Sequence, residues 1–471
     1  MKARKQLKRE GGGGKWIPPT VWIFRLAIGA LFIMSGLVKA IDIWGVVFKF
    51  GDYFTVWDIS VPNSLSVLGA MALSSAEFVL GAMVAFGCFR RTAVWGLLAM
   101  MAVMLPLTFY VWLEDPVSDC GCFGDFMVIG NGATFAKNVL ITAVLLFLAR
   151  YNRRVKCLYH PYSQWLCGVA CFVFITFVEL YGYNVQPMVD FRSFPVGSKL
   201  AERGGPGEDD AEFEFIYEKG GVQRRYTADS LPDSTWTFVD REIIGGVSAD
   251  NGQEMTDLSV MDADGEDVTE DVISGEGLEL IVVVPEPERA DLYYTSFINE
   301  LFEMVAGFDG SLVELTDIPL DSIKGWQDFS MAEFPIYRAE GTVLKELSRG
   351  VVSLVLLEDG VVRWKRNMGS IDVERLVRSE NPRQALLDLA PAGSDLLRWS
   401  VVWLTIALLV LLVADKFFCV IFISKKGGEA ENKYVNLQKQ SCDQASSNGL
   451  SSSCEVKQAD GKDKDAGGRA D

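Results

Sequence analysis

Long apolar stretches alternate with charged segments along the 471 residues of the chain. A run of about 20 apolar residues is long enough to cross the roughly 30 Å hydrocarbon core of a bilayer. The stretches that qualify are 19–41, 66–88, 93–113, 134–150, 163–184 and 398–423. The pattern therefore predicts a mainly α membrane protein with six transmembrane helices.

Basic residues gather at every second connection between these predicted spans. They lie within 2–15, at 90–91, within 150–156 and at 425–426. By the positive-inside rule, this side is the cytoplasm, so both termini are expected there. The protein is then expected in a bacterial cytoplasmic (inner) membrane. A small-x-small cleavage site is missing before Lys39 and Asp42, which favours a retained first helix over a signal peptide.

The rest of the chain divides by composition. We expect a basic cytoplasmic N-terminus, a four-helix membrane domain, an acidic periplasmic linker region with short strands, a second periplasmic domain and a disordered tail. These segments are 1–18, 19–152, 185–277, 278–395 and 425–471. Residues 42–65 are rich in aromatic side chains and are expected to lie on the membrane surface. Residues 186–395 carry 43 acidic and 18 basic residues, although the net charge of the whole chain is only −18. This uneven charge is typical of a chain that occupies two compartments.

The second periplasmic domain has a regular pattern of strands and helices. Strands are expected at 278–284, 311–315 and 335–337, and a hairpin at 352–364 turns at Asp359-Gly360. Helices are expected between these strands and at 371–379, which is the order of the thioredoxin fold. The usual Cys-x-x-Cys position reads Pro285–Asp291 (PEPERAD), and Gly350–Val352 replaces the usual cis-proline. We therefore predict a degenerate thioredoxin-like domain that does not exchange disulfides itself.

The predicted topology sorts the nine cysteines. Cys120 and Cys122 alone are expected to face the oxidising side, because Cys88, Cys157 and the tail cysteines fall on the cytoplasmic side. The cysteines inside predicted spans are interpreted as small apolar packing residues. A Cys-Gly-Cys pair can be a redox-active dithiol, a structural disulfide or part of a metal site, and strained, exposed disulfides tend to be reactive. The only histidine, His160, is on the cytoplasmic side, which argues against a metal site and a histidine-based nucleophile outside.

Glu77 places an ionisable group inside the second predicted span, and such a group is a functional candidate by default. Lys39 and Asp42 lie at the outer end of the first span. An ion pair between Glu77 and Lys39 and a proton-handling role are both consistent with this placement.

Several segments resemble the DoxX-like membrane proteins, specifically the MauE (methylamine utilisation protein) branch. They are Ser35–Lys39 (SGLVK) with Asp42, Gly51–Tyr53 (GDY), Ser74–Phe78 (SSAEF), Asp119–Asp125 (DCGCFGD) and Thr134–Asn138 (TFAKN). The resemblance covers about 20–150. It implies a four-helix core in the style of vitamin K epoxide reductase and a role in maturing methylamine dehydrogenase, a disulfide-rich periplasmic enzyme. The fifth span, the periplasmic part and the sixth span are additions to a bare MauE protein, and they favour a broader role in periplasmic thiol redox.

Two functional hypotheses follow. In the first, Cys120 and Cys122 belong to a membrane thiol–disulfide redox component that serves a periplasmic thiol or disulfide protein. A quinone is then the natural acceptor in the membrane, although no motif identifies a quinone site. In the second, the chain is a non-enzymatic scaffold or assembly factor whose periplasmic domain binds a partner. A transporter is disfavoured, because Pro106 is the only proline well inside a span. The sequence indicates neither a metal nor a nucleic-acid partner.

Overall fold

A computed structural model describes most of the chain. The described residues are 17–114, 130–151, 157–200, 258–273, 275–389 and 393–418, together with the strands at 212–219, 222–227 and 237–244. Cys120, Cys122, the basic N-terminus and the expected disordered tail lie outside the described residues.

Six helices in the described part of the chain are long and apolar enough to cross a membrane, which confirms the predicted multi-pass membrane protein. They are α2 (Ile17–Ile41), α4 (Asn63–Phe86), α5 (Arg90–Glu114), α6 (Asn131–Tyr151), α7 (Gln164–Asn184) and a final helix, Gly393–Phe418. Their mean hydropathy lies between 1.8 and 2.3. The second helix ends earlier than predicted because Gly87, with φ of 73°, terminates it in a left-handed cap.

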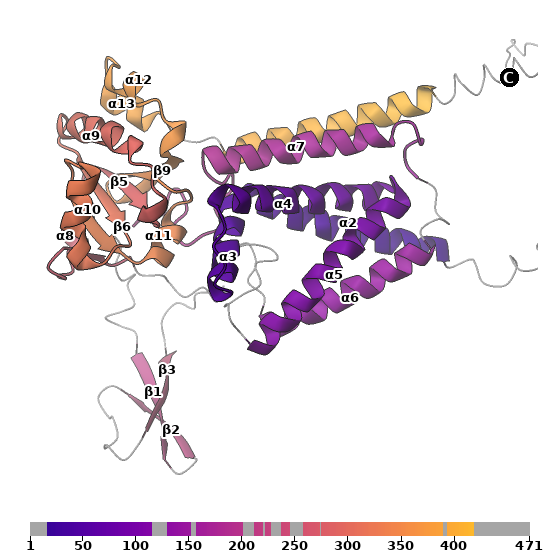
Figure 1. The fold of residues 1–471 in the computed structure, drawn as a ribbon, viewed down its shortest axis with the longest axis horizontal. Helices are drawn as coiled ribbons and strands as arrows, with labels where there is room; N and C mark the ends of the chain where they lie inside the picture. The colour runs from indigo at the N-terminus through magenta and orange to yellow at the C-terminus, as the bar shows by residue number, and fades with distance from the viewer. Residues whose placement is uncertain are drawn as a thin grey trace, which may run out of the picture.

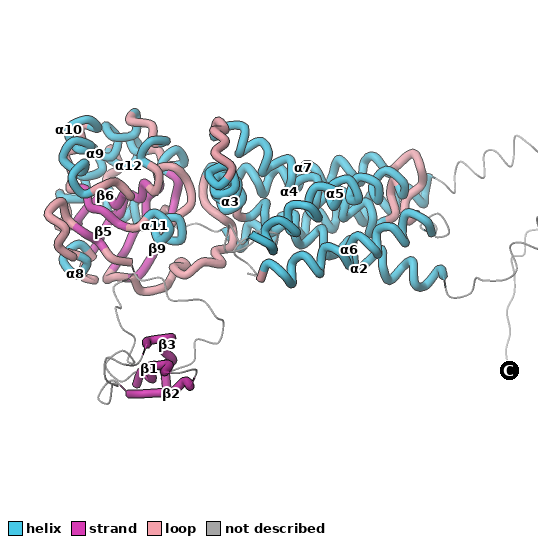
Figure 2. Tube along the Cα trace, turned by 60° about the horizontal axis from the view of Figure 1, so that its bottom comes forward, coloured by secondary structure: helices cyan, strands magenta, loops and turns pink. Residues whose placement is uncertain are grey.

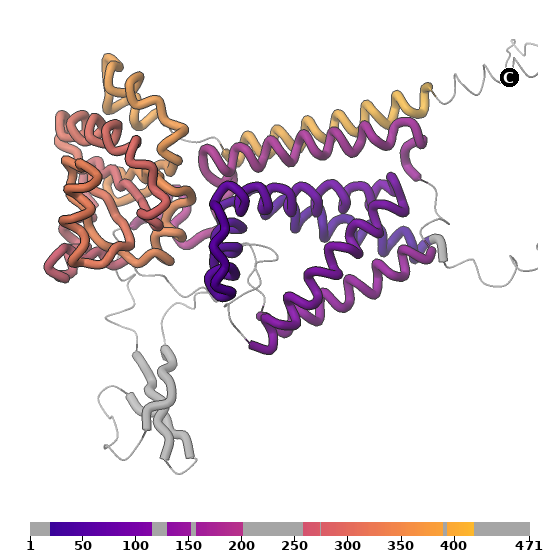
Figure 3. The backbone as a smooth tube through the Cα atoms, viewed as in Figure 1, coloured from indigo at the N-terminus to yellow at the C-terminus, as the bar shows by residue number. Residues whose placement is uncertain are grey.

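Glycines let α2 and α4 pack closely at the centre of the bundle. A Cβ at Gly36 would lie 2.5 Å from the backbone nitrogen of Phe78, and one at Gly29 would lie 2.6 Å from the Cβ of Ala85. The final helix lies along α7 (Figures 1 and 3), and Tyr159 donates a hydrogen bond of 2.9 Å to the carbonyl of Leu408 there.

A shorter helix, α3 (Ile43–Val56), crosses the end of the bundle (Figure 1). Asp42 caps it by accepting a 3.0 Å hydrogen bond from the Gly45 amide. Its inward face buries Ile43, Trp44 and Val47. The location of this segment at the membrane surface stays a prediction.

The domain attached to this end of the bundle has a mixed six-stranded sheet in the order β4-β7-β6-β5-β8-β9. The strands are β4 (Val260–Met261), β5 (Leu278–Val284), β6 (Ser311–Thr316), β7 (Ile336–Ala339), β8 (Ser353–Glu358) and β9 (Val361–Asn367). Strands β5, β6 and β7 are parallel, and the other neighbours are antiparallel. All seven residues of β5 are buried because helices cover both faces of the sheet (Figure 2).

Each face of this sheet has its own hydrophobic core. One core lies under α9 (Tyr293–Ala306), α10 (Ile323–Ser330), α12 (Val373–Val377) and α13 (Pro382–Leu387). The other lies under α8 (Thr269–Val272) and α11 (Gly341–Leu347). The expected hairpin is present, with positive φ at both Asp359 and Gly360, as an Asp-Gly turn requires. The sheet also includes β4, which lies before residue 278, in the segment that the sequence analysis assigned to the acidic linker region.

A second, antiparallel sheet has the order β2-β1-β3. Its strands are β1 (Glu212–Lys219), β2 (Val222–Thr227) and β3 (Thr237–Ile244).

Candidate functional site

The structure brings Lys39 and Glu77 together inside the bundle. The Lys39 ammonium lies 2.9 Å and 2.7 Å from the two carboxylate oxygens of Glu77. Ser35, one turn before Lys39 on α2, accepts a hydrogen bond from Lys39 (2.9 Å) and donates one to Glu77 (2.7 Å). The two charged residues are only 3% and 4% exposed, so each charge depends on the other for compensation.

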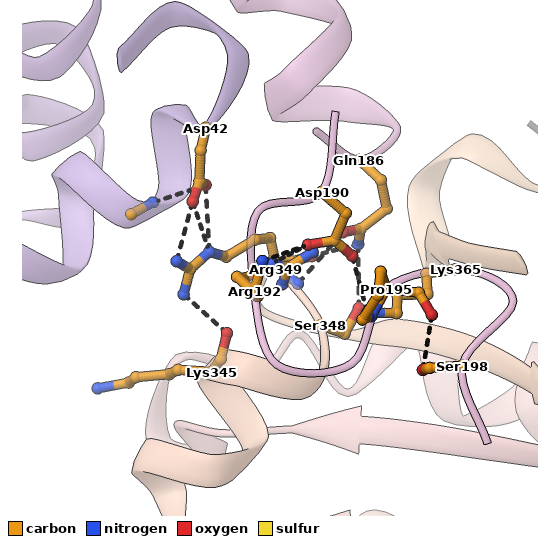
Figure 4. Close-up of polar contacts among 11 residues, drawn as sticks. Asp42, Gln186, Asp190, Arg192, Pro195, Ser198, Lys345, Ser348, Arg349 and Lys365 are labelled. Carbon is orange, nitrogen blue, oxygen red and sulfur yellow. Dashed lines mark hydrogen bonds and ion pairs between the residues drawn. The ribbon is translucent and has the colours of Figure 1, made fainter. Parts of the chain in front are cut away.

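Asp42 takes no part in this ion pair. Its carboxylate instead accepts hydrogen bonds from Arg349 of the sheet domain, with the Nε atom 3.1 Å and 3.0 Å from its two oxygens. A further ion-pair contact of 2.9 Å joins Arg349 Nη2 to the same carboxylate (Figure 4). Asp42 therefore connects the bundle to the attached domain.

An apolar cavity of about 610 Å³ lies beside the ion pair, between α3, α4 and α5. Lys39 contributes a polar group to its wall, and much of the remaining wall is aromatic. The aromatic residues are Phe50, Tyr53, Phe54, Trp57 and Tyr110. Tyr53 stacks on Trp57 at 5.8 Å, and Trp57 contacts Tyr110 at 6.4 Å between ring centroids. A concave apolar site with one or two polar groups is typical of small-molecule binding sites.

A smaller cavity of about 40 Å³ also borders the ion pair. Ser35, Lys39 and Glu77 line it together with Lys137 and Asn138 of α6. Asn138 donates a 3.3 Å hydrogen bond to the Thr108 hydroxyl of α5. Lys39 thus borders both cavities.

The predicted redox pair lies in the connection between α5 and α6. Cys120 and Cys122 are outside the described residues, but the two helix ends that flank them are described. Trp112 of α5 stacks on Phe135 of α6, with 5.5 Å between ring centroids and 13° between ring planes. This contact holds together the two helix ends that the loop connects.

Three buried ionisable residues in the bundle were missed by the sequence analysis. Glu179 of α7 accepts hydrogen bonds of 2.6 Å and 2.9 Å from the hydroxyls of Ser74 and Ser75. Asp415 of the final helix accepts a 2.6 Å hydrogen bond from the Ser163 hydroxyl. Arg25 of α2 is completely buried. Each lies within a predicted span, so the criterion that selected Glu77 would have selected these residues too.

A polar network joins the bundle to the sheet domain (Figure 4). The Gln186 amide donates to the carbonyl of Arg349 (2.6 Å) and the side-chain oxygen of Asn367 (2.9 Å). Asn367 in turn donates to the carbonyl of Tyr183 (2.7 Å), at the end of α7. Nearly all of these groups are buried, so the domain is docked on the bundle rather than tethered to it.

Asp190 forms the second part of this network, with Arg192 at 2.6 Å and Lys365 at 2.9 Å. Burial raises the pKa of Asp190, but the charges of Arg192 and Lys365 outweigh this effect and lower the pKa to about 2. Asp190 therefore stays ionised at any physiological pH, whereas burial lowers the pKa of Lys365 to about 7.

The long apolar helices, the buried ion pair and the attached α/β domain together define a multi-pass membrane protein. Residues 17–151, which form α2 to α6, match the sequence profile of a family described as methylamine utilisation protein MauE. Residues 211–244, which include β1 and β3, match a domain of unknown function designated DUF8463. A search of curated proteins finds no match to the chain.

Proposed function

We propose that this protein is a membrane-embedded thiol–disulfide redox component in which Cys120 and Cys122 cycle between dithiol and disulfide. The observation that carries the proposal is the apolar, aromatic cavity beside the Lys39–Glu77 pair. It borders α5, the helix that leads into the Cys-Gly-Cys loop. The MauE match over residues 17–151 supports a role connected with methylamine utilisation.

The cavity supports a lipid-soluble quinone as the electron acceptor. Oxidation of the two thiols to a disulfide releases two electrons and two protons, which a quinone takes up to become a quinol. Aromatic side chains can pack against a planar ring, and the positive charge of the Lys39 ammonium at the cavity wall can attract a ring carbonyl. Glu77 holds Lys39 in place.

For the attached domain, we propose a thioredoxin-like origin without redox chemistry. The parallel β5–α9–β6 unit and the β8–β9 hairpin followed by α12 support it. Strand β7 lies where a strand was expected at 335–337 and pairs in parallel with β6, and the edge strand β4 is an addition to the order expected from sequence. Residues 185–395 contain no cysteine, so this domain is proposed to bind a periplasmic partner protein or cover the loop.

The topology belongs to the same proposal. The basic connections support a topology with both termini in the cytoplasm and the acidic sheet domain in the periplasm of a bacterium.

A non-enzymatic scaffold is the second candidate, and the buried network around Arg349 favours it. A domain docked in one orientation suits a fixed binding surface as well as it suits a redox enzyme.

Capture of a mixed disulfide distinguishes the two functions. In a Cys122→Ser variant, Cys120 can form a mixed disulfide with a substrate cysteine, but the missing Cys122 thiol cannot resolve it, so a covalent complex with a periplasmic protein is expected. The Cys120→Ser, Cys122→Ser double variant is the control and should capture nothing. A Leu107→Trp variant, which fills the cavity, should slow reoxidation of the pair at least tenfold, whereas Leu113→Trp, outside the cavity on the same helix, should not. Equal capture by the single and double variants would contradict the redox function.

A further inference from the structure

Four cysteines belong to one packed cluster of side chains where α4 ends and α7 begins. This end of the bundle lies opposite the sheet domain (Figure 1). Cys88 follows α4, Cys157 precedes α7, and Cys167 and Cys171 lie one turn apart on α7. All four are free thiols. Packed thiols can exchange disulfides as well as fill space.

Cys157 and Cys88 are the outermost pair of this group. The backbone nitrogen of Leu158 donates a 3.2 Å hydrogen bond to the carbonyl of Phe86, and the Cys157 thiol lies 3.8 Å from the same oxygen. The segment that carries Cys157 is therefore held against the turn that carries Cys88. Cys157 is partly exposed, whereas Cys88 is completely buried. An accessible thiol with a buried neighbour is the arrangement of an attacking and a resolving cysteine.

Arg25 supplies positive charge to this pair. Its Nε and Nη2 atoms donate to the carbonyls of Val84 (3.2 Å) and Ala85 (3.4 Å) at the end of α4, but its buried Nη1 has no hydrogen-bond partner. Gly87 makes room for the guanidinium, because a Cβ there would overlap Nη2. A buried cation with an unused donor next to two thiols favours a thiolate.

The electrostatics agree with this geometry. A hydrogen bond from Cys88 lowers the pKa of Cys157 to about 6, burial opposes this effect, and a backbone hydrogen bond and the charges of Arg90 and Arg25 add to it. The pKa of Cys88 is raised, first by its hydrogen bonds to Cys157 and Cys167 and then by burial. Within this pair, the more exposed Cys157 thiol is thus the one that ionises first.

We propose that Cys157 and Cys88 form a second thiol–disulfide exchange site, on the face of the membrane opposite the sheet domain. The Cys157 thiolate attacks a partner disulfide, which forms a Cys157–partner disulfide and releases one partner thiolate. Cys88 then loses its proton and attacks the Cys157 sulfur, which forms the Cys88–Cys157 disulfide and releases the second partner thiol. The partner gains two electrons and the pair loses two. This proposal does not depend on the chemistry of Cys120 and Cys122.

The site differs from the sequence-based interpretation, which treated these cysteines as reduced or as packing residues. The positive-inside rule places them on the cytoplasmic side, where the resting state is the dithiol. Cytoplasmic disulfides are usually transient and catalytic or redox-sensing. The expected partner is accordingly a cytoplasmic redox protein or small molecule that carries a disulfide.

The test uses the purified full-length chain equilibrated with mixtures of reduced glutathione and glutathione disulfide. Peptide mapping by mass spectrometry should detect a Cys88–Cys157 linkage that rises with the oxidised fraction. A Cys88→Ser variant should instead accumulate a glutathione adduct on Cys157, at least tenfold above the unsubstituted protein. Cys171→Ser, which changes a buried thiol inside α7, is the control and should keep the linkage.

A second measurement needs no substitution. The rate at which iodoacetamide modifies Cys157 in the unsubstituted protein should be half-maximal near pH 6, whereas a cysteine with the ordinary pKa of 9.0 reaches this point three pH units higher. Absence of the Cys88–Cys157 linkage at every glutathione ratio, or a midpoint near pH 9 for Cys157, would overturn the proposal.

Discussion

At the residue scale, the Lys39–Glu77 pair is the feature on which the bundle depends most directly. Removing one member of a buried pair leaves an uncompensated charge, at a cost of about 3–5 kcal/mol. Lys39→Met should therefore lower the unfolding temperature in detergent markedly, and Lys39→Met with Glu77→Leu should recover most of the loss. Arg398→Met, which removes an exposed pair with Asp395, should change little. A double variant no more stable than the single one would contradict this account.

Glu314 of β6 gives the sheet domain a pH-dependent stability. Burial raises its pKa to about 7, although the Trp326 indole donates a 3.1 Å hydrogen bond that opposes the shift. In the unfolded chain the pKa returns to the ordinary glutamate value of 4.5. The stabilisation is therefore complete below pH 4.5 and is lost as the pH rises through 7, because the unfolded state releases the proton first.

Glu314→Gln should remove this dependence and raise the free energy of unfolding at pH 8 by up to about 3 kcal/mol. Thermal unfolding of the full chain at pH 5 and pH 8 measures the effect. Glu374→Gln, on the exposed surface of the same domain, is the control. Equal stability of the Glu314→Gln variant and the unsubstituted protein at pH 8 would show that the raised pKa has no energetic consequence.

Sequence reasoning reached some of these residues and missed others for physical reasons. Glu77 and Lys39 could be singled out because an ionisable group in an apolar span stands out locally. Arg25, Glu179 and Asp415 carry the same signal, because each is an ionisable group in an apolar span, but the sequence analysis did not single them out. The partner of Asp42 could not be predicted, because Arg349 is 307 residues away and only the docking of two separate units brings them together.

At the scale of elements, local sequence patterns predicted which strands and hairpins are present better than they predicted how the strands are arranged in the sheet. The run Leu278–Val284 identified a buried central strand, and Asp359-Gly360 identified a hairpin. The pairing of β4 with β7 and the place of β7 beside β6 had no local signal, because strand order depends on contacts distant in sequence. The approach of Cys157 to Cys88 was missed for the same reason.

The contact between elements that matters most is the docking of α11 and β8 on the end of the bundle that carries α3. Arg349→Ala leaves Asp42 buried without its partner, so the interface should loosen. Hydrogen–deuterium exchange should become at least tenfold faster in residues 185–192 and 348–352. Arg338→Ala, which removes a half-exposed pair with Asp317 in the same domain, should leave exchange at the interface unchanged. Unchanged exchange in both variants would mean that Arg349 does not hold the domain.

At the scale of the whole molecule, the bundle joins two chemically different ends. One end carries the docked sheet domain and the connection that contains Cys120 and Cys122, and the other carries the Cys88–Cys157 group. The apolar cavity and the Lys39–Glu77 pair lie near the first of these ends, because Lys39 is in the last turn of α2 and residues of α3 line the cavity. The presence of a multi-helix membrane bundle could be predicted from hydropathy. The docking of the sheet domain on this bundle could not, because it depends on buried polar contacts distributed over three segments.

The central claim is that Cys120 and Cys122 change redox state during function. Rapid acid quenching of intact cells, followed by alkylation and mass spectrometry of the peptide that contains both cysteines, measures this directly. The account predicts a mixture of dithiol and disulfide, and a shift in the redox state of a periplasmic protein when either cysteine is replaced by serine. A pair that is permanently oxidised, with no effect of the substitutions on any partner, would contradict it and leave the disulfide with a structural role.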